Sequence, residues 1–256
     1  MYTTRQFMRA ESLEEAYDTL TAARNNTILG GCMWLRLGRR AIGTAIDLSA
    51  LGLDTISETD DTIQIGAMVS LRQLETSELL NTWYGNLFRD AVSGIVGTQF
   101  RNTATVGGSV YGRFGFSDVL TALLTLSAQV KLYHRGTVSL EEFCQMPYEK
   151  DIIECILLPK QTYATSYQHM RFQATDFPVL TCAVSRQEDV FRIVVGARPQ
   201  KAVLAYTGQA PDAAAIDDMI VSGLNFSSNM RASAAYRRKI CPVLIRRAIE
   251  EVQTCR

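Results

Sequence analysis

The spacing of apolar positions in the first part of the chain predicts a helix between two short strands. Apolar residues from Leu13 to Leu20 recur at intervals of three and four after Ser12, which can cap a helix and form a capping box with Glu15. Residues 27–29 form a short apolar run that ends at two glycines, which is typical of a buried strand. A helical turn over 32–37 and a second strand over 45–48 follow.

The middle of the chain alternates between regular patterns and one segment without a pattern. Residues 62–66 alternate as a strand does, and residues 70–97 are mostly helical in pattern, with Ser70 and Ser77 as helix caps. From 97 to 118 the chain is glycine-rich and lacks periodicity, which predicts an irregular functional stretch. Ser117 then caps a helix, and strands follow over 129–134 and 151–158.

The last hundred residues have a different pattern. Three apolar runs over 163–171, 179–185 and 190–195 predict an antiparallel meander, and residues 212–223 and 231–252 predict helices. Pro242 lies within the last of these and should kink it or mark its true start. The order predicted is therefore a mixed α and β region, followed by a sheet covered by helices.

Composition places the chain among ordinary globular proteins. Its 256 residues are 47% apolar and 20% charged, and 26 basic residues balance 26 acidic ones. A net charge of zero provides no general attraction to nucleic acid or to anionic membranes. The N-terminal residues do not resemble a signal peptide, and no run approaches the roughly 20 apolar residues of a membrane span. We therefore expect a cytoplasmic protein.

Cysteine and histidine show no pattern that binds a metal or performs catalysis. The six cysteines form no C-x-x-C pair, and His134 and His169 are isolated. We expect unpaired thiols, no iron–sulfur cluster and no zinc site in this chain. With no Ser-His-Asp or Cys-His arrangement either, any redox or transfer chemistry should belong to a cofactor.

Two glycine pairs are the main candidates for binding such a cofactor. Gly30-Gly31 lies where a strand meets a helical turn, and Gly107-Gly108 lies between the hydroxyl residues Thr105 and Ser109. Glycines allow close approach, and N–H groups at a helix start can form an anion-binding nest. Each pair also fits an ordinary tight turn. Two nests in one domain would suit the two phosphates of a pyrophosphate.

Other polar residues have two interpretations each. Asp118, in the first turn of a helix, can complement the helix dipole or accept hydrogen bonds from sugar hydroxyls. Gln99, Arg101 and Asn102 can satisfy loop backbone groups, and Arg101 can alternatively face a phosphate. The basic residues of the last helix can form a solvated face or a docking face for an acidic partner.

Several motifs together resemble those of one family. The segments are TILGGCMWLRLG (27–38), IGAMVSLRQLE (65–75), GTQFRNTATVGGSVYGRFGFSD (97–118), MRFQATDFPVL (170–180) and RASAAYRRKICPVLIRRAIEEV (231–252). They resemble the FAD-binding subunit of the molybdenum hydroxylases, the xanthine dehydrogenase and carbon monoxide dehydrogenase group, over nearly the whole chain. The resemblance implies an α+β fold, with a two-subdomain FAD-binding domain of the vanillyl-alcohol-oxidase (PCMH) type over 1–160, divided near 56. A small antiparallel-sheet-plus-helix domain would occupy 161–256.

The resemblance also implies a set of FAD-binding residues. A first segment would wrap the pyrophosphate: Ile28, Leu29, Gly30, Gly31, Cys32, Met33 and Trp34. A second set would hold the other side of the diphosphate and the ribityl chain: Thr105, Gly107, Gly108, Ser109 and Gly112. Asp118 would bind a sugar hydroxyl, Ile95 would line the adenine end, and Ile153 would line the isoalloxazine ring.

The implied role is electron relay, with no catalytic residue and no metal in this chain. A molybdopterin-binding large subunit and a [2Fe–2S] small subunit would be its partners, and NAD or another compound would be the acceptor. The sequence differs from the family pattern at Cys32-Met33-Trp34, at residues 111–116, and at Gln168, near where a lysine often lies beside the flavin. A scaffold with a degenerate flavin fold and a stand-alone flavin reductase are the alternatives.

Overall fold

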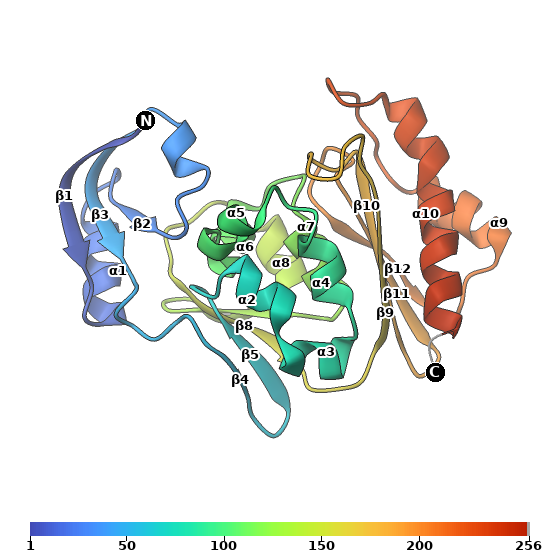
Figure 1. Cartoon of the computed structure of the whole chain (residues 1–256), viewed down its shortest axis with the longest axis horizontal. Helices are drawn as coiled ribbons and strands as arrows, with labels where there is room; N and C mark the ends of the chain where they lie inside the picture. Colours follow the sequence, from blue (N-terminus) through green and yellow to red (C-terminus); the bar gives the residue numbers. More distant parts are fainter. Residues whose placement is uncertain (255–256) are drawn as a thin grey trace.

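Three sheets lie in a row in the computed structural model, which describes residues 1–254 (Figure 1). The N-terminal sheet is parallel, with the order β1-β3-β2, and helix α1 packs against it. Ser12 caps α1 by accepting a hydrogen bond from the Glu15 N–H, and Ala16 and Leu20 face the core. The elements are β1 (Thr3–Arg9), α1 (Leu13–Ala22), β2 (Thr27–Leu29), the 3₁₀ turn η1 (Leu35–Leu37) and β3 (Ala41–Asp47).

The central sheet is antiparallel and has the order β4-β5-β8-β6-β7. Its strands are β4 (Ile56–Glu58), β5 (Thr62–Gly66), β6 (Gln129–Leu132), β7 (Gly136–Ser139) and β8 (Ile153–Pro159). The helices packed around it are α2 (Leu71–Thr76), α3 (Glu78–Tyr84), α4 (Leu87–Val92), α5 (Thr98–Thr103), α6 (Val106–Gly112), α7 (Asp118–Leu124) and α8 (Leu140–Gln145). Ser70, Ser77 and Ser117 cap α2, α3 and α7, as predicted.

The prediction of an irregular stretch from 97 to 118 is wrong for much of its length, because two short helices, α5 and α6, occupy it. Helix α6 forms despite its two glycines because neighbouring chain satisfies its first N–H groups. The Val106 and Gly107 N–H groups donate to the Val69 and Ala67 carbonyls at 2.8 Å each. A β-carbon on Gly107 would lie 2.7 Å from that Ala67 oxygen, so glycine permits the close packing.

The C-terminal sheet is an antiparallel meander with the order β12-β11-β10-β9, and α10 covers one face of it (Figure 1). The elements are β9 (Ala164–Met170), β10 (Leu180–Gln187), β11 (Val190–Gly196), β12 (Val203–Gly208), α9 (Ala213–Ala215), the π-helical turn η2 (Ile216–Val221) and α10 (Ala234–Thr254). The patterns in the sequence did not predict β1 or β12, whose residues are mostly exposed or half-buried. Pro242 lies inside α10 and does not mark its start.

The predicted mixed α+β architecture is therefore present. Each sheet is built from its own stretch of chain, which supports a division near residues 56 and 160 that we retain as a proposal. The C-terminal sheet nevertheless contributes Tyr167, Ala183 and Val194 to the apolar cluster of the central region, so the two regions share part of their core.

Candidate functional site

The two glycine pairs, far apart in the sequence, meet in space. A β-carbon on Gly30 would lie 2.9 Å from the Thr105 Oγ1 atom and 3.9 Å from the Gly108 Cα atom. A β-carbon on Gly31 would lie 2.0 Å from the Thr103 carbonyl oxygen. The turn after β2 therefore packs directly against the connection between α5 and α6. Only glycine allows these two backbone segments to lie so close together.

The first turn presents a run of N–H groups. Those of Gly31, Cys32, Met33 and Trp34 donate to no acceptor within residues 1–254. Cys32 adopts a left-handed conformation with φ of 57°, and its thiol donates to the Gly30 carbonyl at 3.3 Å. Successive amides around a left-handed residue form a concave site for an anion. This turn can therefore bind a phosphate group through its backbone.

The second turn offers a ligand the hydroxyl group of Thr105, because the N–H groups of its two glycines are already bonded within the protein. The Gly107 N–H is already bonded to Ala67, and the Gly108 N–H donates to Thr105 Oγ1 at 3.2 Å. The interpretation of this pair as a second nest of free amides is therefore wrong. Thr105 Oγ1 acts only as an acceptor among the described residues, so its proton is free to bind a ligand. The Ser109 hydroxyl donates to the Thr105 carbonyl at 2.9 Å.

Residues of these turns line two separate cavities. One, of about 310 Å³, we call the aromatic cavity, and the other, of about 340 Å³, the basic cavity. Of the predicted site residues, the aromatic cavity is lined by Met33, Trp34, Ile95, Ser109 and Asp118. The basic cavity is lined by Ile28, Gly30, Thr105, Gly107, Gly108 and Ile153. Both turns thus contribute to both cavities, as a site that holds the middle of a long ligand would require.

A group of aromatic rings forms one wall of the aromatic cavity. The Trp34 ring centroid lies 5.5 Å from that of Phe114, 5.2 Å from that of Phe116 and 5.7 Å from that of Phe177. Phe114 and Phe116 stack with their centroids 5.2 Å apart. Phe177 follows β9, so the C-terminal sheet region contributes to this wall. Sequence reasoning identified Trp34 as a site residue and missed the three phenylalanines.

Asp118 is buried at the edge of the aromatic cavity, where the central helices meet the C-terminal sheet. Its Oδ1 atom accepts hydrogen bonds from the Tyr167 hydroxyl at 2.6 Å and from Arg171 Nη2 at 2.5 Å. Burial raises the pKa of Asp118 to about 6, although the Arg171 charge and the two hydrogen bonds act in the opposite direction. The binding of a sugar hydroxyl by Asp118 stays a prediction, since one of its oxygens already has protein partners.

Basic and tyrosine side chains surround the basic cavity, and sequence reasoning did not select them. Arg24, Arg40 and Lys150 line it together with Tyr111 and Tyr148. Lys150 Nζ donates to the carbonyl of Leu20, in the last turn of α1, at 2.7 Å and to that of Ala23, at its C-cap, at 2.5 Å. Burial, with a smaller contribution from Arg40, lowers the pKa of Lys150. These cations lie on separate segments, so no single motif reveals them.

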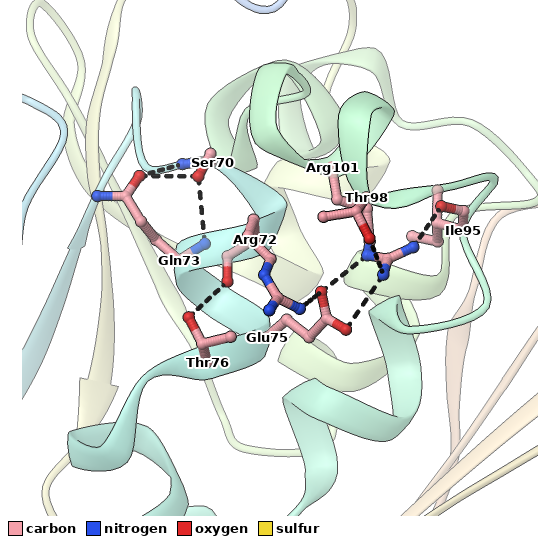
Figure 2. A network of polar contacts seen from close by, with 8 residues as sticks. All are labelled: Ser70, Arg72, Gln73, Glu75, Thr76, Ile95, Thr98 and Arg101. Carbon is pink, nitrogen blue, oxygen red and sulfur yellow. Dashed lines mark hydrogen bonds and ion pairs between the residues drawn. The ribbon is translucent and has the colours of Figure 1, made fainter.

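Arg101 forms a buried ion pair between two helices and is not available to bind a phosphate. Its guanidinium donates to both oxygens of Glu75, at 2.8 and 3.2 Å, and to the Ile95 carbonyl at 3.1 Å (Figure 2). Both side chains of this ion pair are more than nine-tenths buried. The pair joins α2 to α5 and fixes Ile95 at the aromatic cavity. Of the two interpretations of Arg101, the structure supports the structural one.

Four of the predicted site residues line neither cavity: Leu29, Gly31, Cys32 and Gly112. Gly31 and Cys32 shape the first turn, and a β-carbon on Gly112 would lie 2.5 Å from the Phe114 ring. Gln168 also lies elsewhere, with its amide donating to Glu251 Oε1 of α10 at 2.8 Å. These residues can therefore act on a ligand only through the backbone or through their neighbours.

Much of the basic character of the last helix is used internally. Arg237 is buried and donates to the Val179, Ser227 and Ala232 carbonyls at 2.7 to 2.9 Å. Arg246 pairs with Asp217 at 2.5 Å. Arg237 is therefore part neither of a solvated face nor of a docking face for a partner, the two interpretations that the sequence left open.

Within the described part of the chain, no group of three or more His, Cys, Asp or Glu side chains is arranged to hold a metal ion. None of the helices within residues 1–254 has the length and hydropathy needed to cross a membrane.

Comparisons with known proteins identify relatives over nearly the whole length of the chain. A family described as the FAD binding domain in molybdopterin dehydrogenase matches residues 3–161. The uncharacterized protein YgfM of Escherichia coli (strain K12) is 27% identical over 252 residues, covering 94% of this chain and 93% of that protein. The nicotine 6-hydroxylase medium subunit of Paenarthrobacter nicotinovorans is 27% identical over 272 residues, covering 94% of each.

A solved structure shows the same fold. A chain of the reconstituted CO dehydrogenase from Oligotropha carboxidovorans superposes with a TM-score of 0.86 at 22% identity, covering 98% of each chain.

Proposed function

Because the chain belongs to the family of FAD-binding domains in molybdopterin dehydrogenases, and FAD is therefore its cofactor, we propose that it is the electron-transferring flavin subunit of a molybdenum hydroxylase. The observation that carries the proposal is the meeting of the two glycine turns between two cavities. FAD has two ring systems joined through a pyrophosphate, and residues of both turns line both cavities, so a pyrophosphate held at the turns could extend a ring system into each cavity.

The residues present fit this cofactor. The free amides of residues 31–34 would bind pyrophosphate oxygens, and the Thr105 proton would add a donor from the other side. A side chain at Gly30 would occupy the space between them. Ile95 and Ile153 line different cavities, which supports their assignment to opposite ends of the cofactor. The resemblance assigns the adenine to the Ile95 end and the isoalloxazine to the Ile153 end.

The chain's own residues would bind, orient and shield the cofactor. Bound FAD supplies a carrier that can receive electrons singly and release them as a pair. The cations of the basic cavity would favour a ligand that carries negative charge, and the aromatic wall would exclude water from a bound ring. No side chain of this chain is needed as an acid or a base.

The proposed partners are a molybdopterin-binding large subunit and a [2Fe–2S] small subunit. The similarity to a medium subunit of nicotine 6-hydroxylase over nearly the whole of both chains supports a place in such an assembly. We propose NAD or another small acceptor as the destination of the electrons. An oxidation like that of xanthine dehydrogenase is one form of this chemistry, and the substrate would be bound by the large subunit.

Purification of the full chain from its own cells under mild conditions tests this function. We expect FAD, molybdenum and iron to copurify in fixed ratio, and the preparation to exchange electrons between NADH and a dye. Molybdenum and iron without FAD would support a scaffold instead. FAD with turnover by the chain alone, without either metal, would support a stand-alone reductase.

A further inference from the structure

The wall of the aromatic cavity carries an inference about how the cofactor is held. We propose that Trp34 stacks on one planar ring of the bound FAD, and that Phe116 and Phe177 hold the indole in place for this contact. The inference rests on the proposed function, because it takes FAD as the ligand.

The first support is the position of Trp34 relative to the anion-binding turn. Its own N–H is the last of the four free amides of residues 31–34, and its side chain lines the aromatic cavity. A ligand whose phosphate lies on that turn would therefore carry its attached ring toward the indole. In FAD, only a sugar or a ribityl chain separates the pyrophosphate from each ring.

The second support is the exposure of the indole. The Trp34 residue is 41% exposed, although Phe114, Phe116 and Phe177 surround it at 5.2 to 5.7 Å between centroids. Their planes are tilted from that of the indole by 37° to 48°. A tryptophan that serves packing alone is buried to a greater extent. This one is fixed from one side and presents the rest of its surface to the cavity.

The third support is the contact of the Arg231 cation with Phe177, one of the rings that form the aromatic wall. The Arg231 guanidinium carbon lies 4.6 Å from the Phe177 ring centroid, and Arg231 also pairs with Asp176 at 3.4 Å. Phe177 is thereby fixed between Arg231 and the other rings. Residues from beyond β9 thus complete a site that begins at the N-terminal sheet, so the C-terminal region contributes to cofactor retention.

The shared chemistry is a planar heteroaromatic ring joined to a phosphate, which both halves of FAD possess. Loss of a base stacked on an aromatic side chain weakens binding by about tenfold or more. We therefore expect Trp34→Ala to weaken FAD binding by about tenfold or more, and Trp34→Phe to retain most of the affinity.

Tryptophan fluorescence of the full apo chain provides the test. The other tryptophan, Trp83, lies beside Lys160 and lines neither cavity, so Trp83→Phe leaves Trp34 as the only indole. This variant is titrated with FAD, with FMN and with ADP. We expect FAD to quench the emission of Trp34. Quenching by FMN would identify the stacked ring as the isoalloxazine, and quenching by ADP would identify it as the adenine.

Phe7→Ala, at an exposed aromatic position outside both cavities, is the control that should bind FAD as the wild type does.

The outcomes separate this inference from the function on which it rests. Normal FAD uptake with unchanged Trp34 emission, and wild-type affinity in Trp34→Ala, would overturn the stacking role and leave the flavin function intact. Failure of the wild-type chain to take up FAD at all would overturn both. Circular dichroism of Trp34→Ala shows whether a loss of affinity reflects a loss of fold.

Discussion

Gly31 lies so close to Thr103 that a β-carbon added to it would stand 2.0 Å from the Thr103 carbonyl oxygen. Because that oxygen belongs to the backbone, the turn itself would have to move. We expect Gly31→Ala to lower the free energy of unfolding by about 1–3 kcal/mol, as overpacking does, and to weaken FAD binding at least tenfold. Urea unfolding and FAD titration measure the two effects.

Gly38→Ala is the matched control in the same loop. A β-carbon there would approach the Leu35 carbonyl at 3.4 Å, and Gly38 has an ordinary φ of −84°. Equal losses in Gly31→Ala and Gly38→Ala would show that the close packing at Gly31 has no special role.

The Thr105 hydroxyl both caps α6 and leaves one proton for a ligand. We expect Thr105→Val to lose the cap to Gly108 N–H, at a cost of about 1 kcal/mol in stability, and to weaken FAD binding. Thr105→Ser keeps the hydroxyl and should restore both properties in unfolding and binding measurements. If Thr105→Val bound FAD as tightly as Thr105→Ser, the hydroxyl would not be a ligand.

The buried pair of Arg101 and Glu75 should contribute strongly to stability. Removal of Glu75 leaves the Arg101 charge buried without its carboxylate partner, so we expect Glu75→Ala to cost about 3–5 kcal/mol in urea unfolding. Replacement of both by apolar residues, as in Arg101→Met with Glu75→Leu, should cost clearly less. A double replacement as damaging as the single one would contradict this explanation.

The same pair predicts a dependence on pH. Burial alone would raise the pKa of Glu75, but hydrogen bonds and charges from Arg101 and Arg72 outweigh it and lower that pKa below 4.5. A lowered carboxyl pKa adds stability that is complete above the unfolded pKa and lost as pH falls through the folded one. Below about pH 4.5 the wild type should therefore lose stability more steeply than Glu75→Gln does.

Asp118 should give stability a pH dependence opposite in sign to that of Glu75. Its pKa rises from 3.8 to about 6 on folding, so between these pH values the folded state holds a proton that the unfolded state has released. Its contribution to the free energy of unfolding therefore falls as pH rises from about 4 to 6, and is constant above that. The stability of Asp118→Asn relative to the wild type should rise across this window in urea unfolding.

Asp217→Asn, at a half-exposed carboxylate paired with Arg246, is the control for that series. A stability difference between Asp118→Asn and the wild type that did not change from pH 4 to 6 would contradict the raised pKa.

Local signals predicted much of this fold. Serine caps and apolar spacing identified α1, α2, α3 and α7, because each depends on residues close in sequence. They did not identify α6, whose glycines form a helix only because Ala67 and Val69 accept its first N–H groups. Strand β1 was missed because its residues are largely exposed and lack a period of two.

The part of the candidate site that was predictable consists of residues close together in the sequence. The glycine pairs and their hydroxyl neighbours are visible as motifs, and the structure brings them together. The aromatic wall and the basic cavity draw on separate segments, so Phe177 and Lys150 carry no local signal of their role. Arg101 lies inside the most specific motif, yet its contacts with Glu75 are a matter of packing that spacing does not reveal.

The flavin content of the purified full-length chain tests the central claim most directly. The protein, expressed with riboflavin available and then denatured, should release FAD in a one-to-one ratio, and the apo chain should bind added FAD again. Gly31→Ala should release far less, and Gly38→Ala the same amount as the wild type. A colourless, folded wild-type chain that failed to bind added FAD would contradict a cofactor held between the two glycine turns.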